Sequence, residues 1–282
     1  MSNTGFWGSF AKRLLSFCLV FLGLIAIAPQ MRAADNSEDY DSYKLRFDAY
    51  WFYVQPSGTF FGTRGNGSFN LNSDVNFQTY STITGKIDWK FTRKNHLFFA
   101  AIPFEHSRSF VTNRSINFQG QTFDVGLNAS ADLQVNVYAP GYQYDIIRRK
   151  RGHLGFQIQL NLFDIQGSIS AAAQVVNGAQ QTAHRAEGSL RAPLPVAGPD
   201  LRLYLLPHSS RLFVTGNLLG MYFFGYGNFL STLDTVGLTL NQHFAIRGGY
   251  QLGNRLNVNT KTDQIGINLT SKGPVVGAEV SF

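Results

Sequence analysis

The stretch FDVGLNASADLQVNVY, from Phe123 to Tyr138, decides the fold. Its odd-numbered positions are all apolar, and its even-numbered positions are mostly polar. Because successive side chains of a strand point to opposite faces, the stretch predicts one ribbon with an apolar and a polar face. Its 16 residues exceed the about five or six of an ordinary globular strand. This length favours a tilted strand that crosses a membrane and continues beyond it.

The same two-residue period recurs along the chain. Phe77–Phe91 alternates, as do Leu212–Tyr226 and Phe244–Leu252. Leu154–Leu162 also alternates, and the phase then reverses at Leu162 and Phe163, which predicts a β-bulge. No segment after residue 28 approaches 18 consecutive apolar residues. A membrane location would therefore require strands and not helices.

Polar turns divide the chain into about ten strands, with eight or twelve as alternatives. The predicted strands lie near residues 43–56, 76–91, 96–111, 123–146, 153–169, 189–206, 212–226, 229–240, 244–258 and 265–282. Short connections alternate with longer ones, an arrangement typical of membrane barrels with short periplasmic turns. The sequence thus predicts an all-β fold, a single up-and-down antiparallel transmembrane β-barrel. The alternative is a secreted soluble β-sandwich, whose strands should be shorter.

Residues 1–34 predict an export signal. Lys12 and Arg13 precede the apolar run Leu14–Ala28, which is too short for a comfortable membrane-spanning helix but suits a signal peptide. An uncleaved anchor is the alternative. Residues 35–282 then form one barrel domain. Since the single cysteine, Cys18, lies inside the signal, the mature part can have neither disulfides nor a cysteine nucleophile.

Aromatic residues near the strand ends predict the two rims of the barrel. The outer rim would contain Trp51, Tyr53, Tyr222, Phe224 and Tyr226. The inner rim would contain Trp89, Phe91, Phe244 and Phe282. The side chains predicted to point into the lumen include Tyr50, Phe52, Tyr80, Tyr138 and Phe223.

The chain ends in GAEVSF, from Gly277 to Phe282, an alternating strand with a terminal aromatic residue. With the signal segment and the repeated alternation, this ending resembles bacterial outer-membrane β-barrel proteins. The resemblance concerns the architecture of residues 40–282. It implies export through the inner membrane to the outer membrane of a Gram-negative bacterium, and contact with outer-membrane lipid and lipopolysaccharide. It also implies that the barrel assembly machinery recognises Phe282. We expect a monomer.

No catalytic or metal-binding pattern stands out in the sequence. The six histidines lack H-E-x-x-H spacing, and His106 and Ser107, as strand neighbours, would face opposite sides. We therefore expect no enzyme, no metal site and no cofactor. The formal charge of +7 is modest, and the basic run Arg148–Arg151 predicts a solvated turn and not a nucleic-acid site.

Charged side chains on the predicted inner face are the candidate site. They are Arg46, Asp48, Lys86, Asp88, Arg202, Arg247 and Glu279. Enclosed charges need partners, which predicts an ion-pair network that either fills the lumen or forms a solute-selecting constriction. Because a barrel of about eight strands is filled by side chains, ten strands allow at most a narrow lumen.

Two functions follow from a narrow lumen. The first is a porin-like channel for small solutes. The second is a non-transporting structural or surface-binding barrel, which acts through extracellular loops near residues 57–75 and 170–188.

Overall fold

The computed structural model of the 282-residue chain describes residues 39–62, 67–77, 79–176, 179–181, 183–223, 227–258 and 265–282. The predicted signal segment 1–34 lies outside the described residues, as do Phe224 and Tyr226 and the side chain of Phe223. In the described part of the chain, no helix is long and apolar enough to cross a membrane.

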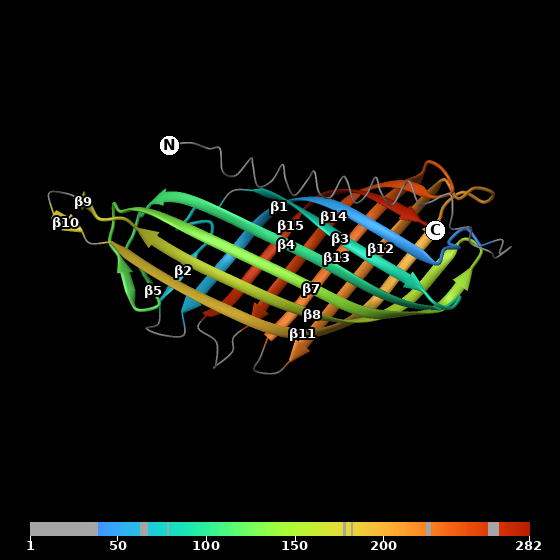
Figure 1. The fold of residues 1–282 in the computed structure, drawn as a ribbon, viewed down its shortest axis with the longest axis horizontal. Coiled ribbons are helices and arrows are strands. Elements are labelled where there is room, and N and C mark those ends of the chain that lie inside the picture. The colour runs from blue at the N-terminus through green and yellow to red at the C-terminus, as the bar shows by residue number, and fades with distance from the viewer. Residues whose placement is uncertain are drawn as a thin grey trace.

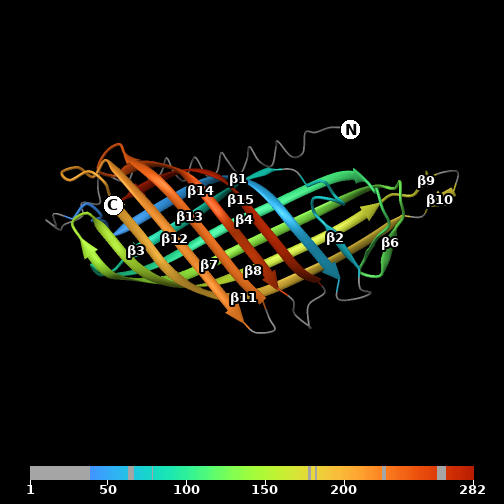
Figure 2. The same cartoon turned by 180° about the vertical axis from the view of Figure 1, so that it is seen from behind.

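Ten long strands form one closed antiparallel barrel (Figures 1 and 2). They are β1 (Leu45–Gly62), β3 (Tyr80–Lys90), β4 (Asn95–Val111), β7 (Asn128–Arg149), β8 (Gly152–Ala171), β11 (His184–Tyr204), β12 (Leu212–Phe223), β13 (Gly227–Thr239), β14 (Phe244–Val258) and β15 (Ile265–Ser281). Each long strand pairs with the next one along the chain, and β15 pairs with β1. The predicted up-and-down barrel of ten strands is confirmed.

Among the described residues, five short strands accompany the barrel. β2 (Ser68–Asn70) pairs with the end of β1. The other four form two separate hairpins, β5 (Ile116–Phe118) with β6 (Gln121–Phe123) and β9 (Gln174–Val176) with β10 (Ala179–Gln181).

The barrel is longer on one side than on the other. β4, β7, β8 and β11 have 17 to 22 residues, whereas β12 and β13 have 12 and 13. In Figure 1, β4, β7, β8 and β11 project together beyond the other barrel strands, toward the β5 and β9 hairpins. We call this projection, with residues 67–77 and 112–127, the lobe. The opposite end holds Phe282 and the short turns, and we call it the terminal end.

An apolar belt surrounds the outer surface between the terminal end and the lobe. On β8, the outward side chains change from Leu160 and Leu162 to Asp164 and Gln166. The strand register places this change at one level on four strands. The last apolar row is Ala101, Tyr138, Leu162 and Pro193, and the first polar row above it is Pro103, Asn136, Asp164 and Arg191.

The predicted bulge at Leu162 and Phe163 is wrong. Odd-numbered residues of β8 are buried on both sides of this point, so the backbone alternation never reverses. What reverses is polarity, because the strand leaves the apolar belt and enters the lobe, whose outside is polar and whose interior is apolar. The register irregularities lie elsewhere, at 145/147, 230/232 and 251/254.

The stretch that predicts the fold also changes surroundings. Leu133, Val135 and Val137 of β7 are buried inside the barrel, so its apolar face points inward. Tyr138, predicted to point into the lumen, points outward and is 47% exposed. Phe77, predicted on a strand with Trp89, precedes β3 and is buried in the lobe. Alternation alone cannot tell an apolar core from lipid.

The predicted rim aromatics divide into exposed and covered residues. Trp51, Tyr53, Tyr222, Trp89 and Phe91 are exposed on the outer surface. Phe282 is buried, since it packs with the partly buried rings of Phe47 and Phe244.

Candidate functional site

The structure places all seven predicted lumen charges inside the terminal half of the barrel. Arg202 donates two hydrogen bonds of 2.8 Å to the Glu279 carboxylate. Arg247 lies 2.9 Å from Asp48 and 3.4 Å from Glu279. These contacts join strands β1, β11, β14 and β15 across the lumen.

The remaining predicted charges gather around Asp88. This carboxylate lies 3.6 Å from Arg46 and 3.8 Å from Lys86. Lys86 is the least buried member of the cluster, with 23% of its side chain exposed, and its ammonium group lies over the Phe98 ring. The seven residues therefore form a mixed-charge network, which we call the lumen network.

Asp41, which the sequence analysis missed, lies at the centre of the lumen network. It belongs to residues 39–44, a segment that precedes β1 and that we call the strap. Five basic side chains lie within 4 Å of its carboxylate. They are His153 at 2.8 Å, Arg46 at 3.2 Å, Lys90 and Arg202 at 3.5 Å, and Arg148 at 3.7 Å. No motif marks Asp41, because these partners are far apart in the sequence.

Backbone hydrogen bonds and rings hold the strap across the terminal end. The Tyr40 amide donates to the Lys150 carbonyl at 3.0 Å, and the Lys44 amide donates to the Phe282 carbonyl at 2.6 Å. The Tyr43 ring is buried beneath the Lys90 ammonium, 3.7 Å from its centroid. The strap thus covers the terminal mouth of the barrel.

Arg148 was predicted in a solvated turn, but its side chain is buried. Its guanidinium lies 2.7 Å from Asp39 of the strap and 2.8 Å from Asp145. The turn itself is limited to Lys150 and Arg151. Arg148 is therefore a further member of the lumen network.

Two buried histidines bridge carboxylates in the same region. His96 lies 3.1 Å from both Asp88 and Asp145. His153 lies 2.8 Å from Asp41 and 3.0 Å from Asp200. A signal for them exists in the sequence, since both occupy inward positions of alternating strands, close to the short turns. In the described part of the chain, no group of three potential ligands could hold a metal ion.

The strap carboxylate is held in its ionised form. Burial alone would raise the pKa of Asp41, but the charges of Lys90, His153 and Arg202 together hold this pKa well below its usual value. Asp41 therefore contributes a permanent negative charge opposite the basic side chains.

The lobe fills the other end of the lumen with apolar side chains. Leu71, Ile116, Phe118, Phe123 and Leu127 are fully buried there. The rings of Phe69 and Phe118 meet edge to face, with centroids 5.0 Å apart. Between this lobe core and the lumen network lies a cavity of about 80 Å³, lined by residues that include Phe52, Tyr80 and Phe104.

An ion pair fixes the two capping segments of the lobe to each other. Arg114 donates two hydrogen bonds to Asp74, at 2.5 and 2.6 Å. Burial alone would raise the pKa of Asp74, but its hydrogen bonds, above all those from Arg114, lower it below the usual value. Residues 67–77 and 112–127 therefore close the lobe together.

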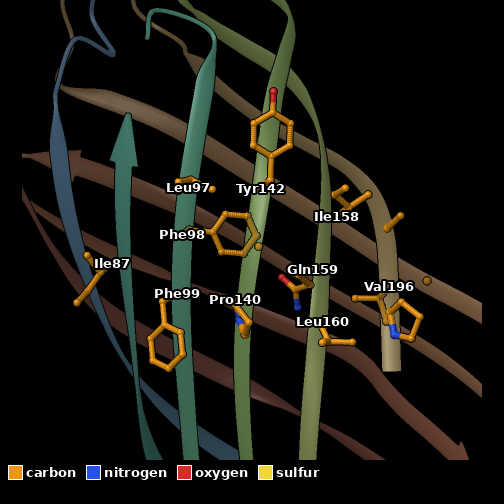
Figure 3. A pocket seen from close by; sticks show the side chains of 14 residues that line it. Ile87, Leu97, Phe98, Phe99, Pro140, Tyr142, Ile158, Gln159, Leu160 and Val196 are labelled. Atoms are coloured by element: carbon orange, nitrogen blue, oxygen red, sulfur yellow. The ribbon is translucent and has the colours of Figure 1, made fainter. Parts of the chain in front are cut away.

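The outside of the described part of the barrel contains a polar hollow and an apolar hollow. A polar hollow of about 440 Å³ lies on the outer face of the lobe, lined by residues that include Ser107, Asp132 and Ser168. An apolar hollow of about 930 Å³ lies in the belt (Figure 3). It extends over β4, β7, β8 and β11 and contains the exposed side chains of Phe99 and Leu160.

Comparison with known proteins yields likenesses of fold. No protein-family model and no curated protein sequence matches the chain. The chain is similar to the outer membrane protease OmpT from Escherichia coli, with 11% identity, a TM-score of 0.46, and coverage of 87% of this chain and 100% of that one. It is also similar to the Pseudomonas putida toluene transporter TodX, with 8% identity, a TM-score of 0.37, and coverage of 85% and 90%.

A third similar structure is the attachment invasion locus protein Ail of Yersinia pestis. Here the identity is 9% and the TM-score 0.31, with coverage of 85% of this chain and 99% of that one. The names of the three proteins describe a protease, a transporter and an attachment protein. At these identities the likeness assigns no activity to this chain.

Proposed function

We propose that the chain is an integral protein of the bacterial outer membrane, closed to solutes, that acts through the surface of its lobe. Under this proposal it works as a monomer and without enzymatic activity. The apolar belt supports the membrane location. On β8 it runs from Leu154 to Leu162, which corresponds to about 20 Å of height at about 3.3 Å per residue and a tilt of about 40°. This height is near the about 25 Å apolar band of such barrels.

The main support for a barrel closed to solutes is that side chains fill the lumen at both ends. The strap and the lumen network occupy the terminal half, with Asp41 paired to basic side chains of several strands. The lobe core occupies the other half with buried rings such as Phe118 and Phe123. An aqueous channel requires a polar path along its whole length, and the apolar lobe core interrupts such a path.

The outer face of the lobe supports a surface-binding role. Register aligns its outward side chains in rows across β4, β7, β8 and β11. The rows are Ser109, Ser130, Ser170 and Arg185, then Ser107, Asp132, Ser168 and Glu187, then Glu105, Gln134, Gln166 and Ser189. Arg185 and the residues of the second and third rows line the polar hollow. The hydroxyl, amide and charged groups of all three rows can bind a hydrophilic partner through hydrogen bonds.

Single-channel recording tests the closed barrel. The refolded protein, shown to be folded by its gel shift between unboiled and boiled samples, is placed in a planar bilayer. We expect no stable conductance steps. Reproducible small steps would contradict the proposal and support the alternative channel.

The second candidate is the narrow porin-like channel. The observation that favours it is the mixed charge of the lumen network, including the partly exposed Lys86. In a channel, Lys86→Glu and Arg247→Glu would change ion selectivity. In a closed barrel, the same substitutions change only stability. The same recordings on both variants therefore distinguish the two candidates.

A further inference from the structure

The apolar hollow in the belt has a composition that suits one kind of ligand. Exposed Leu97, Phe99, Ile158 and Leu160 lie in its lining, which contains no charged residue (Figure 3). The inward-facing side chains of Phe98 and Gln159 also reach it, so the hollow extends into the wall between the strands. The only polar side chains of the lining are Gln159 and Tyr142. The hollow therefore suits an apolar ligand.

Small and cyclic residues produce the hollow. Pro140, Pro195, Ala197 and Gly220 stand where other outward positions of the belt carry leucine, isoleucine or aromatic side chains. The pairing of β7 with β8 passes from Tyr138–Leu162 to Gly141–Gln159, so Ala139 and Pro140 are left out of the ladder. Proline lacks an N–H donor, which explains the interruption. The hollow therefore results from specific small and cyclic residues in the barrel wall.

The hollow lies just below the upper boundary of the belt. On β11, Pro195 lines the hollow, and Arg191 lies four residues farther toward the lobe on the same face. The Arg191 side chain is 79% exposed, and its Nε donates a hydrogen bond of 3.4 Å to Asp164. A guanidinium has five N–H donors, so most remain for an anionic group. An apolar hollow and a cation above it match the two parts of a membrane lipid.

We infer that the hollow is a binding site for one acyl chain of a phosphate-bearing membrane lipid, whose headgroup contacts Arg191. The inference rests on the proposed membrane location. In a bilayer the hollow faces acyl chains, and a void in the wall would forfeit the dispersion contacts that a flexible chain regains. Arginine recognises phosphate oxygens with paired hydrogen bonds. The alternative occupant is a second copy of the protein. Its barrel wall is convex and would leave the hollow unfilled.

Photocrosslinking tests the site. The full barrel is refolded into phosphatidylethanolamine vesicles that contain a small fraction of the same lipid with a diazirine in its acyl chain. After illumination, labelled peptides are identified by mass spectrometry. We expect label concentrated in residues 97–99, 140–142 and 158–160, several-fold above the belt of β13 to β15. Equal labelling around the belt would overturn the inference.

A matched pair of variants sharpens the test. Gly220→Leu places a side chain in the lining of the hollow, where an added Cβ makes only ordinary contacts, the nearest at 3.8 Å. Gly248→Leu makes the same change on the exposed face of β14, where an added Cβ meets no atom within 4 Å. We expect Gly220→Leu to reduce labelling several-fold and Gly248→Leu to leave it unchanged. Unchanged labelling in Gly220→Leu would overturn the site.

Further measurements test the lipid site and the membrane location independently. Arg191→Gln should lower lipid retention, measured by native mass spectrometry, without moving the label along the chain. Crosslinks between two copies through the same peptides would overturn the inference in favour of a dimer. If the folded barrel fails to insert into vesicles at all, the proposed membrane location fails. If it inserts but labels evenly, only the lipid site fails.

Discussion

At the scale of single residues, Asp41 connects the strap to the barrel wall. Its carboxylate faces His153, Arg46 and Lys90 within 3.5 Å, and it is buried. Removing one partner of a buried ion pair leaves the other charge less compensated, and full loss of a partner costs about 3–5 kcal/mol. We expect Asp41→Asn to lower the free energy of unfolding by about this amount, measured by urea titration of the gel shift. Asp164→Asn, on the outer face, is the control and should change little. Equal stability of Asp41→Asn and wild type would show that the strap is not held by charge.

The same residue predicts a pH dependence. The pKa of Asp41 is lowered in the folded protein, so the folded state favours its charged form. The resulting stabilisation is present above the unfolded pKa of about 3.9 and is lost as the pH falls through the folded pKa. Wild type should therefore exceed Asp41→Asn in stability at neutral pH, and the difference should shrink only below about pH 4. A difference that already disappeared near pH 6 would show that the charge of Asp41 is not the source of the stabilisation.

Asp234 is a charged residue on the outer face of the apolar belt. It is exposed on the outer face of β13. Leu230, Val236 and Leu238 of the same strand point outward as well. A charged side chain on the lipid face costs up to about 2–4 kcal/mol for Arg or Lys at the midplane, and less for Asp. We expect Asp234→Leu to stabilise the barrel in vesicles and to have little effect in detergent, measured by unfolding titrations in both. Destabilisation in vesicles would indicate that Asp234 has a polar partner in the membrane.

At the scale of elements, the β5–β6 hairpin fills the lobe without pairing with the strands of the barrel wall. Phe118 is fully buried and contacts Phe69 at 5.0 Å between centroids. Replacing a buried Phe with Ala costs about 3–5 kcal/mol. Because β5 and β6 pair only with each other, the loss should be local. We expect Phe118→Ala to speed hydrogen exchange in residues 112–127 while the gel shift of the barrel stays intact. Loss of the gel shift would mean that the lobe and the barrel unfold together.

Strand positions could be predicted from the sequence, but the surroundings of each face could not. The two-residue period located all ten long strands, since alternation reflects backbone geometry. It could not distinguish an exposed apolar surface from the protein interior, so Tyr138 was assigned to the wrong face and Phe163 suggested a bulge that does not exist. Both errors arise where β7 and β8 cross from the belt into the lobe, because there the polarity of each face reverses.

The candidate site could be predicted only for residues on regular strands. Arg46, Asp88 and Arg247 follow from alternation, since their inward positions are fixed by strand phase. Asp41 does not, because it precedes β1, and its position depends on a chain path with no period. Arg148 was assigned to solvent because a run of four basic residues usually marks a turn, whereas its charge is directed inward to Asp39 and Asp145.

At the scale of the whole molecule, the proposed membrane location makes the belt boundary the feature that determines how the barrel lies in the bilayer. Phe156 and Gln166 occupy the same outer face of β8, one inside the belt and the other above it. An arginine on the lipid face costs about 2–4 kcal/mol at the midplane and about 0–1 kcal/mol near the interface. We expect Phe156→Arg to reduce the folded fraction in vesicles strongly, and Gln166→Arg to fold like wild type, measured by gel shift after refolding. Equal tolerance of both substitutions would place the membrane elsewhere on the barrel or remove it altogether. Equal loss would extend the membrane into the lobe, and the polar rows could then no longer serve as a surface open to water.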